Sequence, residues 1–462
     1  MSRPLILLFL IVTALMPGQT TCQDDDALMI SRIHDESLGN GRSWKWLTGL
    51  CTRHGGRIAG SHAYLEATDY TAGLLAGIPG VRAYKQDCQA DHWIRGDHEE
   101  VVIKKSKAGK LKLKALSLGN SVATPPGGVT AEVIEVKSLD EVEKLGREKI
   151  SGKIVFYNRP MDPTKIRTFS AYGGAADQRV YGPAKAAEYG AVAALVRSMT
   201  TQADDFPHTG VTVYKDSLNK IPGIAISTND ADRLSNLLSQ GPVHIYCRTN
   251  CRQEGKKPAP TVIGEIRGSE FPDEIILVGG HLDSWDVGQG AHDDGAGCIQ
   301  SAEVLRILTT LGYKPKRTIR CVLFSNEENG LAGGKTYAAE SNRKGEFHLA
   351  AIESDAGGFS PRGFGFDADT SVFKTYYRNV SKWLPLLESY GLQFETGGGG
   401  ADIGPLKSQK GLLVGLRPDS QRYFDFHHTA NDRIENVNRR ELELGAAAMA
   451  SLVFLIDKYG IK

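Results

Sequence analysis

The C-terminal half of the chain alternates short apolar runs with segments whose apolar residues recur at helical spacing. Apolar runs at 275–278, 318–324 and 349–353 predict buried strands. The run at 275–278 is followed by a predicted helix with apolar residues at Ile299, Ala302, Leu305 and Leu308. A last helix, with one apolar face, is predicted over 440–459. This alternation predicts an α/β fold with a mostly parallel sheet and helices on both faces.

The pattern changes between residues 121 and 255, where short strands and a few helices predict a separate β-rich insertion. We therefore divide the chain into a leader (1–22), a first part of the main domain (23–120), the insertion (121–255) and the rest of the main domain (256–462). The insertion contains no cluster of ligand-type residues. Its His208 is interpreted as a surface histidine and not as a metal ligand.

The first residues have the layout of a signal peptide. Arg3 precedes an apolar run over 5–16 that is too short to span a bilayer but suits the core of a signal peptide. Cleavage near residues 20–23 predicts a secreted or periplasmic protein. The alternative is a lipoprotein whose only membrane contact is a lipid anchor on Cys22. No other segment is predicted to cross a membrane.

The composition limits the number of domains and the kinds of partner, but it does not by itself indicate a function. The 462 residues exceed what one hydrophobic core usually serves, and a net charge of +1 argues against a nucleic-acid partner. Of seven cysteines, Cys298 and Cys321 lie in apolar patterns and are interpreted as buried thiols. Cys247 and Cys251 are spaced so that they could close a small disulfide loop in an oxidising compartment.

Side chains that can bind metal ions follow the ends of the predicted strands. In open α/β sheets ligands bind at the carboxyl ends of the strands, and imidazole and carboxylate groups suit zinc. A single imidazole or carboxylate after a strand usually lies in a solvated turn. Here four separate strand ends or loops each supply such side chains, and this predicts a metal centre. The side chains concerned are His281, Asp283 and Asp293, then Glu327 and Glu328, then Asp355, and finally His427 and His428.

The order of these motifs resembles the two-zinc aminopeptidase/glutamate carboxypeptidase family, and within it the plasma glutamate carboxypeptidase branch. Further segments that carry the resemblance are 57–61, 92–96, 124–132 and 281–290. The resemblance covers nearly everything after residue 30. It implies a zinc exopeptidase fold, a peptide substrate and a homodimer, and the insertion resembles a protease-associated domain that roofs the site without supplying a zinc ligand.

The resemblance also implies roles for single residues. His281 and Asp355 would hold one zinc ion, Glu328 and His428 a second, and Asp293 would bridge the two. Glu327 would be the general base and Asp283 the acceptor that orients the imidazole of His281. Substrate contacts are implied for His427, Gly399 and Asp402, and a cis peptide bond is implied after Asp293. Asp432 is interpreted either as a further supporting acid or as a solvent-facing turn residue.

The expected function is hydrolysis of dipeptides or short peptides outside the cytoplasm by a two-zinc-bound hydroxide. Three alternatives share the fold: an aminopeptidase that acts on longer peptides, a single-zinc glutaminyl cyclase, and a non-catalytic binding protein. The complete set of five ligands favours a two-metal enzyme over the last two. The sequence does not distinguish an aminopeptidase from a carboxypeptidase-like dipeptidase.

Overall fold

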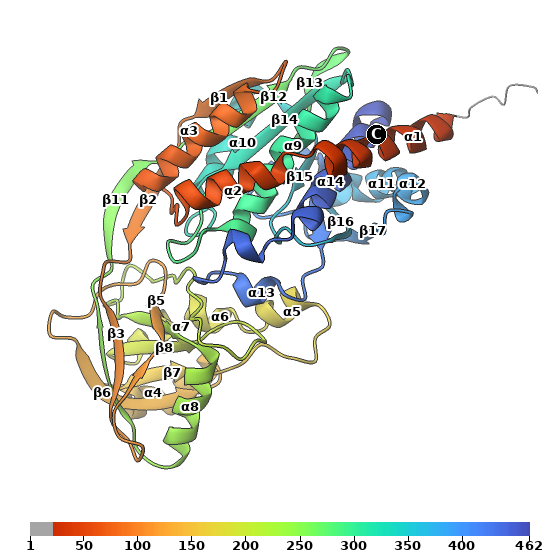
Figure 1. Ribbon diagram of the computed structural model, residues 1–462. Helices are drawn as coiled ribbons and strands as arrows, with labels where there is room; N and C mark the ends of the chain where they lie inside the picture. The colour runs from red at the N-terminus through yellow and green to blue at the C-terminus, as the bar shows by residue number, and fades with distance from the viewer. Residues whose placement is uncertain (1–21) are drawn as a thin grey trace, which may run out of the picture.

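The computed structural model describes residues 22–462, which form two eight-stranded sheets joined by a two-stranded ribbon (Figure 1). The predicted signal segment lies outside the described residues, apart from Cys22 at the start of the first helix. Within the described part of the chain, no helix has both the length and the apolar character needed to cross a membrane.

The first sheet belongs to the main domain and is parallel at its centre. β14, β13, β15 and β18 run parallel, whereas β12 and β16 join this group antiparallel on either side. The sheet is thus mixed: these four central strands are parallel to one another, and β16 and β17 form a further parallel pair at one edge. In spatial order its strands are β1 (Arg82–Gln86), β12 (Thr261–Ile266), β14 (Arg317–Phe324), β13 (Phe271–His281), β15 (Phe347–Glu353), β18 (Leu412–Pro418), β16 (Pro361–Asp367) and β17 (Gln393–Thr396).

Helices cover both faces of this sheet, because alternate residues of the central strands are buried on opposite sides. In β13, Ile276 and Val278 join the core on one face, while Ile275 and Leu277 join the core on the other. The first face is covered by α1 (Cys22–Asn40), α2 (Ser43–His54), α3 (His62–Ala76), α9 (Ala296–Thr310), α11 (Thr370–Val380), η2 (Ser381–Trp383), α12 (Leu384–Glu388) and α14 (Arg439–Tyr459). The second face is covered by α10 (Ala332–Lys344) and η3 (Gly404–Gln409).

The chain leaves the main domain along β2 (Gln89–Ile94) and returns along β11 (Arg252–Pro258). These two strands pair antiparallel and form the ribbon between the two sheets (Figure 1). Three short segments then complete the main domain: η1 (Ala291–Gly295), α13 (Tyr423–Phe426) and η4 (Ile434–Asn436).

The second sheet takes its first strands from before residue 121. Helices pack on both of its faces, so the inserted unit is mixed α/β rather than purely β. In spatial order its strands are β4 (Leu111–Leu113), β3 (Glu99–Lys105), β10 (His244–Thr249), β6 (Val129–Val136), β7 (Ile154–Tyr157), β8 (Ala193–Arg197), β9 (Gly223–Ile226) and β5 (Ala115–Ser117). Its helices are α4 (Leu139–Ile150), α5 (Thr168–Gly173), α6 (Asp177–Val180), α7 (Gly182–Glu188) and α8 (Thr228–Ser239).

Two details of the inserted unit differ from the sequence interpretation. His208 is only 2% exposed, so its assignment to the surface is wrong. Its loop is held against the main domain, where the amide of Thr209 donates to the carbonyl of His428 at 3.0 Å. Cys247 and Cys251 are both buried free thiols, as are the predicted Cys298 and Cys321.

The core of the main domain contains a histidine that fits only when it is neutral. Gln409 Oε1 accepts from Nδ1 of His348 at 3.0 Å, which leaves Nε2 to accept from the hydroxyl of Tyr337 at 2.8 Å. Burial lowers the pKa of His348 to about 4. Protonation therefore occurs more readily in the unfolded chain, where the pKa of histidine is about 6.5.

We expect His348 to make the protein less stable as the pH falls from about 6.5 to 4, because the unfolded state then binds more protons than the folded state. The full effect of this one group is about 3 kcal/mol. His348→Gln should flatten this part of the pH profile whatever it does to the stability at neutral pH. The measurement is urea unfolding of both proteins at several pH values in EDTA. Equal slopes would contradict the assignment.

Candidate metal centre

The predicted ligands meet because neighbouring parallel strands end at the same edge of the main sheet. β13 ends at His281, Glu327 and Glu328 follow the end of β14, and Asp355 follows the end of β15. β14, β13 and β15 are adjacent, so these side chains share the crevice at their carboxyl ends. Asp293 reaches the same crevice from η1, the turn that leads into α9.

Asp293 lies at the centre of this group, with one carboxylate oxygen toward each of two imidazoles. Its Oδ1 is 3.2 Å from Nε2 of His281, which is also 3.5 Å from Oδ1 of Asp355. Its Oδ2 is 3.3 Å from Nε2 of His428, which is also 3.0 Å from Oε2 of Glu328. The five residues therefore form two groups of potential ligands that share one carboxylate.

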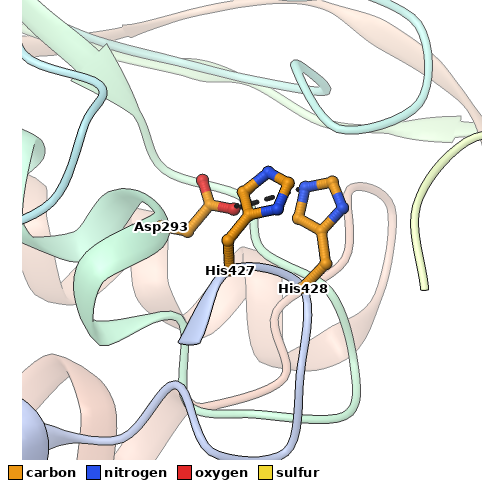
Figure 2. A group of neighbouring side chains, drawn as sticks. All are labelled: Asp293, His427 and His428. Atoms are coloured by element: carbon orange, nitrogen blue, oxygen red, sulfur yellow. Dashed lines mark ion pairs between the residues drawn. The ribbon is translucent and has the colours of Figure 1, made fainter. Parts of the chain in front are cut away.

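The two adjacent histidines are distinguished by their hydrogen bonds. Figure 2 shows both rings beside the carboxylate of Asp293, and they stack with centroids 3.5 Å apart. Nδ1 of His428 lies 3.3 Å from the carbonyl oxygen of Thr209, which accepts a hydrogen bond when Nδ1 is protonated, and 3.4 Å from Nη1 of Arg179. With Nδ1 protonated, Nε2 of His428 presents a lone pair to the acidic group. Nε2 of His427 is farther from Asp293 Oδ2, at 3.7 Å.

The ring of His281 is fixed in the same way, but not by the group expected from the sequence. Its Nδ1 donates to the backbone carbonyl of Asp283 at 3.0 Å, whereas the carboxylate of Asp283 is 3.9 Å away. That carboxylate instead accepts from the backbone amides of Glu327 at 3.1 Å and Glu328 at 3.3 Å. Asp283 thus orients the imidazole through its main chain and the two glutamates through its side chain.

Two further acids hold the backbone around Asp293. Asp294 accepts from the amides of His281 and Gly297, at 3.1 and 3.0 Å. Asp432 is buried and accepts from the amides of His292 and Asp293, at 2.7 and 3.1 Å, so it is a supporting acid and not a solvent-facing one. The peptide bond between Asp293 and Asp294 is cis, as the resemblance implies.

The charge of this group fits a bound cation. Oδ2 of Asp293 and Oε1 of Glu328 are buried without a hydrogen-bond partner, and burial raises the pKa of both side chains. Buried carboxylates of this kind are stabilised by a counter-charge or a metal ion. Burial, reinforced by the carboxylates of Asp355 and Asp283 and opposed by His281, raises the pKa of Glu327 to about 8.

A cavity of about 460 Å³ opens above the acidic group, and both domains form its wall. The inserted unit contributes aromatic, apolar and cationic side chains that the sequence analysis did not single out, because neither spacing nor periodicity connects them with the site. Lining residues from this unit are Phe169, Tyr172, Arg179, Val211 and Val213.

From the main domain, His427 lies on the wall as expected, but Gly399 and Asp402 do not belong to it. Gly399 packs against Leu413, and the carboxylate of Asp402 is buried beside Glu353. The glycine-rich loop is thus turned into the domain at these positions, and nothing in this geometry supports substrate contact by either residue.

Known proteins are similar to this chain in both sequence and fold. The model of Peptidase family M28 matches residues 261–453. Carboxypeptidase Q of Bos taurus is 32% identical over 451 residues, which cover 95% of this chain and 92% of that protein. The solved structure of a peptidase M28 precursor from Shewanella amazonensis SB2B is 30% identical, covers 94% of this chain and 97% of its own, and superposes with a TM-score of 0.88.

A solved zinc aminopeptidase from Bacillus subtilis is 17% identical and has a TM-score of 0.62, with 90% of this chain and 94% of that chain covered, and so shares the fold. The fold, the acidic crevice with its histidines and the relatives that match along most of the chain define a metallo-exopeptidase. The chain belongs to peptidase family M28.

The hydrogen bonds of the two histidines predict which one is a ligand. His428→Ala should weaken zinc binding by more than the roughly 10- to 100-fold that loss of an outer hydrogen-bond partner costs. The matched variant His427→Ala should weaken it less, because its Nε2 is farther from the shared carboxylate. Competition with a chromogenic chelator measures both affinities. A stronger effect of His427→Ala would reverse the assignment.

Proposed function

We propose that this chain is an exported two-zinc exopeptidase that hydrolyses dipeptides or short peptides. The observation that carries the proposal is Asp293, whose two carboxylate oxygens each face one imidazole at the floor of the cavity. A single-zinc glutaminyl cyclase or a non-catalytic binding protein would need only part of this arrangement.

The residues divide into two sets around the shared carboxylate. His281 and Asp355 would hold one zinc ion, Glu328 and His428 the other, and Asp293 both, each imidazole binding through Nε2. When bound, zinc supplies Lewis acidity and lowers the pKa of a bound water to about 7.

Glu327 is the group best placed to move the proton. It follows the ligand-bearing strand end, lines the cavity and makes no ion pair with either imidazole among the described residues. Its carboxylate would take a proton from the attacking water as the new C–O bond forms. The proton would then pass to the amine nitrogen as the C–N bond breaks. Asp283 would orient Glu327 by accepting from its backbone amide.

The inserted unit would act as the roof of the site. We retain residues 121–255 as a protease-associated-like insertion in the main domain (23–120 and 256–462), with the strands of 99–117 added to its sheet. The support is its share of the cavity wall and the bond between Thr209 and His428. The unit would supply substrate contacts and an acceptor for one ligand, but no ligand of its own. A homodimer, implied by the resemblance, stays part of the proposal.

The decisive experiment separates the proposed base from its neighbouring ligand. Glu327→Gln should keep two zinc ions per chain and lose about 10²- to 10⁴-fold in kcat on a free dipeptide, because proton transfer is lost but no ligand is. Glu328→Gln should lose zinc as well as activity. Glu340→Gln, on the exposed side of α10, is the matched control.

Zinc content and dipeptide turnover are measured on the same preparations, before and after chelation and re-addition of zinc. Full occupancy at one ion per chain would refute the two-zinc proposal. Retained zinc in Glu328→Gln together with lost zinc in Glu327→Gln would exchange the two roles.

Export rests on the leader, whose apolar run at 5–16 precedes Cys22. The exported protein should begin between about residues 20 and 23, as the usual layout of signal peptides requires. Intact-mass measurement distinguishes an unmodified start, which supports a secreted or periplasmic protein, from a diacylated Cys22, which supports a lipoprotein. An exported protein that retains residues 1–16 would contradict both.

A further inference from the structure

Arg95 connects the two domains at the end of the ribbon. It follows β2, where the chain enters the inserted unit (Figure 1), and its side chain is only 8% exposed. Nη2 lies 2.7 Å from Oδ1 of Asp286, in the main-domain loop after β13, and Nε is 3.0 Å from Oδ2 of the same carboxylate. In the inserted unit, Nη1 donates to the carbonyl of Ser117 at 2.6 Å and Nη2 donates to the hydroxyl of Thr209 at 3.3 Å.

The charge of Arg95 is balanced by one acid from each domain. Asp286 belongs to the main domain, and Glu99, whose Oε1 is 3.2 Å from Nη1, begins β3 of the inserted unit. A buried guanidinium that loses one of its acids is costly, so these ion pairs disfavour separation of the two domains at this point.

The loop that carries Asp286 is itself fixed within the main domain. The fully buried Arg57 donates to three of its carbonyls, those of Leu282 at 2.5 Å, Gln289 at 2.6 Å and Gly290 at 2.8 Å. Both ends of the loop are therefore bound to one side chain, which makes Asp286 a fixed attachment point for Arg95.

Two residues beside this connection contact the proposed ligand His428. The amide of Thr209 donates to the carbonyl of His428 at 3.0 Å, and the carbonyl of Thr209 lies 3.3 Å from Nδ1 of its ring. The indole of Trp285, the residue before Asp286, packs edge-on against the same imidazole, with ring centroids 5.8 Å apart. Arg95 thus acts on His428 through Thr209 in the inserted unit and through the loop of Asp286 in the main domain.

A glycine allows the inserted unit to approach this indole. A Cβ atom on Gly119 would lie 1.8 Å from Cη2 of Trp285, so a larger residue does not fit there. The amide of Gly119 donates to the carbonyl of Gly210 at 2.9 Å, and the hydroxyl of Thr209 donates to the carbonyl of Ser117 at 2.8 Å. The two segments of the inserted unit that reach the main domain are therefore bound to each other as well as to Arg95.

The other imidazole is held within the main domain. Nδ1 of His281 donates to the carbonyl of Asp283, and Asp355 follows β15 of the same domain. A displacement of the inserted unit would change the surroundings of His428 but would leave this hydrogen bond of His281 in place. The two ligand groups therefore differ in how far they depend on the inserted unit.

We propose that Arg95 is a positioning residue that couples the docking of the inserted unit to zinc binding by His428 and Glu328. The inference rests on the proposed two-zinc function and specifies how one of the two ions is controlled. Loss of the connection would weaken this ion and leave the ion held by His281 and Asp355 unchanged. Because coupling between two binding events is reciprocal, zinc at His428 would also stabilise the docked position of the inserted unit.

The test is a zinc titration of the metal-free, full-length protein against a chromogenic chelator, which measures both affinities without turnover. The wild-type protein should bind two ions. Arg95→Gln should bind one of them about 10-fold more weakly, the lower end of the loss expected when an outer hydrogen-bond partner is removed. Arg95→Lys should recover part of the affinity, because it keeps the charge but not the paired donors.

Asp286→Asn is a milder variant, because this side chain is 25% exposed and keeps its size, and it should weaken the same ion. In the His428→Ala background, Arg95→Gln should cause no further loss, because both changes then affect one interaction. Arg320→Gln is the matched control. Arg320 is also 8% exposed and lies 2.9 Å from Glu346, but it belongs to the main sheet, so its loss should leave both zinc affinities unchanged.

Hydrogen exchange tests the reciprocal effect. The amide of Thr209 is protected by its bond to His428, so exchange in the segment 208–212 should become faster when EDTA removes zinc from the wild-type protein. Arg95→Gln should speed exchange in this segment even with zinc bound, and Arg320→Gln should not. Unchanged exchange on removal of zinc would contradict the coupling.

The outcomes separate the two proposals. A wild-type protein that binds only one zinc ion at saturation overturns the two-zinc proposal and this inference with it. Two ions in the wild type, with equal loss of both or of neither in Arg95→Gln and Asp286→Asn, overturn the role of Arg95 and leave the two-zinc proposal standing. The same loss in Arg320→Gln also overturns that role, because general destabilisation is then sufficient. If Arg95→Gln does not fold, Asp286→Asn alone decides between these results.

Discussion

The architecture of the site depends on holding several carboxylates close together away from water. Like charges at such distances disfavour each other, and burial adds to the cost. The chain meets this constraint in two ways. Asp283, Asp294 and Asp432 each accept hydrogen bonds from backbone amides, and in doing so they fix the strand ends and the turn η1. Asp293 and Glu328 instead each keep one buried oxygen that has no hydrogen bond, which suits them to a cation.

The orientations of the two imidazoles also depend on backbone groups. Each of His281 and His428 has Nδ1 next to a backbone carbonyl, so each directs the lone pair of Nε2 toward the acids. One carbonyl comes from the neighbouring turn at Asp283 and the other from Thr209 in the inserted unit. A local turn thus fixes one imidazole, while a contact between domains fixes the other.

Much of this was predictable from the sequence, for identifiable physical reasons. The apolar runs before His281, Glu327 and Asp355 predicted strands, and they are β13, β14 and β15, which bring these residues to one edge. Such runs are reliable because both faces of a central strand are buried. The antiparallel neighbours of the parallel strands were not anticipated, since pairing partners leave no local signal.

Contacts between distant parts of the chain were the harder part. Nothing in the sequence near Arg179 or Tyr172 indicates that they line the cavity, because this depends on how the inserted unit packs against the main domain. The bond between Thr209 and His428 spans 219 positions, which explains why His208 was wrongly placed on the surface. The use of the Asp283 carbonyl instead of its carboxylate is a matter of turn geometry that residue types alone do not reveal.

The contact between Thr209 and His428 limits how the inserted unit of such a protein can be replaced. The chain enters and leaves the inserted unit through the ribbon of β2 and β11, which suggests that the unit could be exchanged between proteins at this ribbon alone. However, the unit also carries the carbonyl that lies 3.3 Å from Nδ1 of His428. A transplanted roof would have to present an acceptor at the same place, or the recipient would lose the orientation of that imidazole. The two units therefore depend on each other at the site, although their sheets are separate.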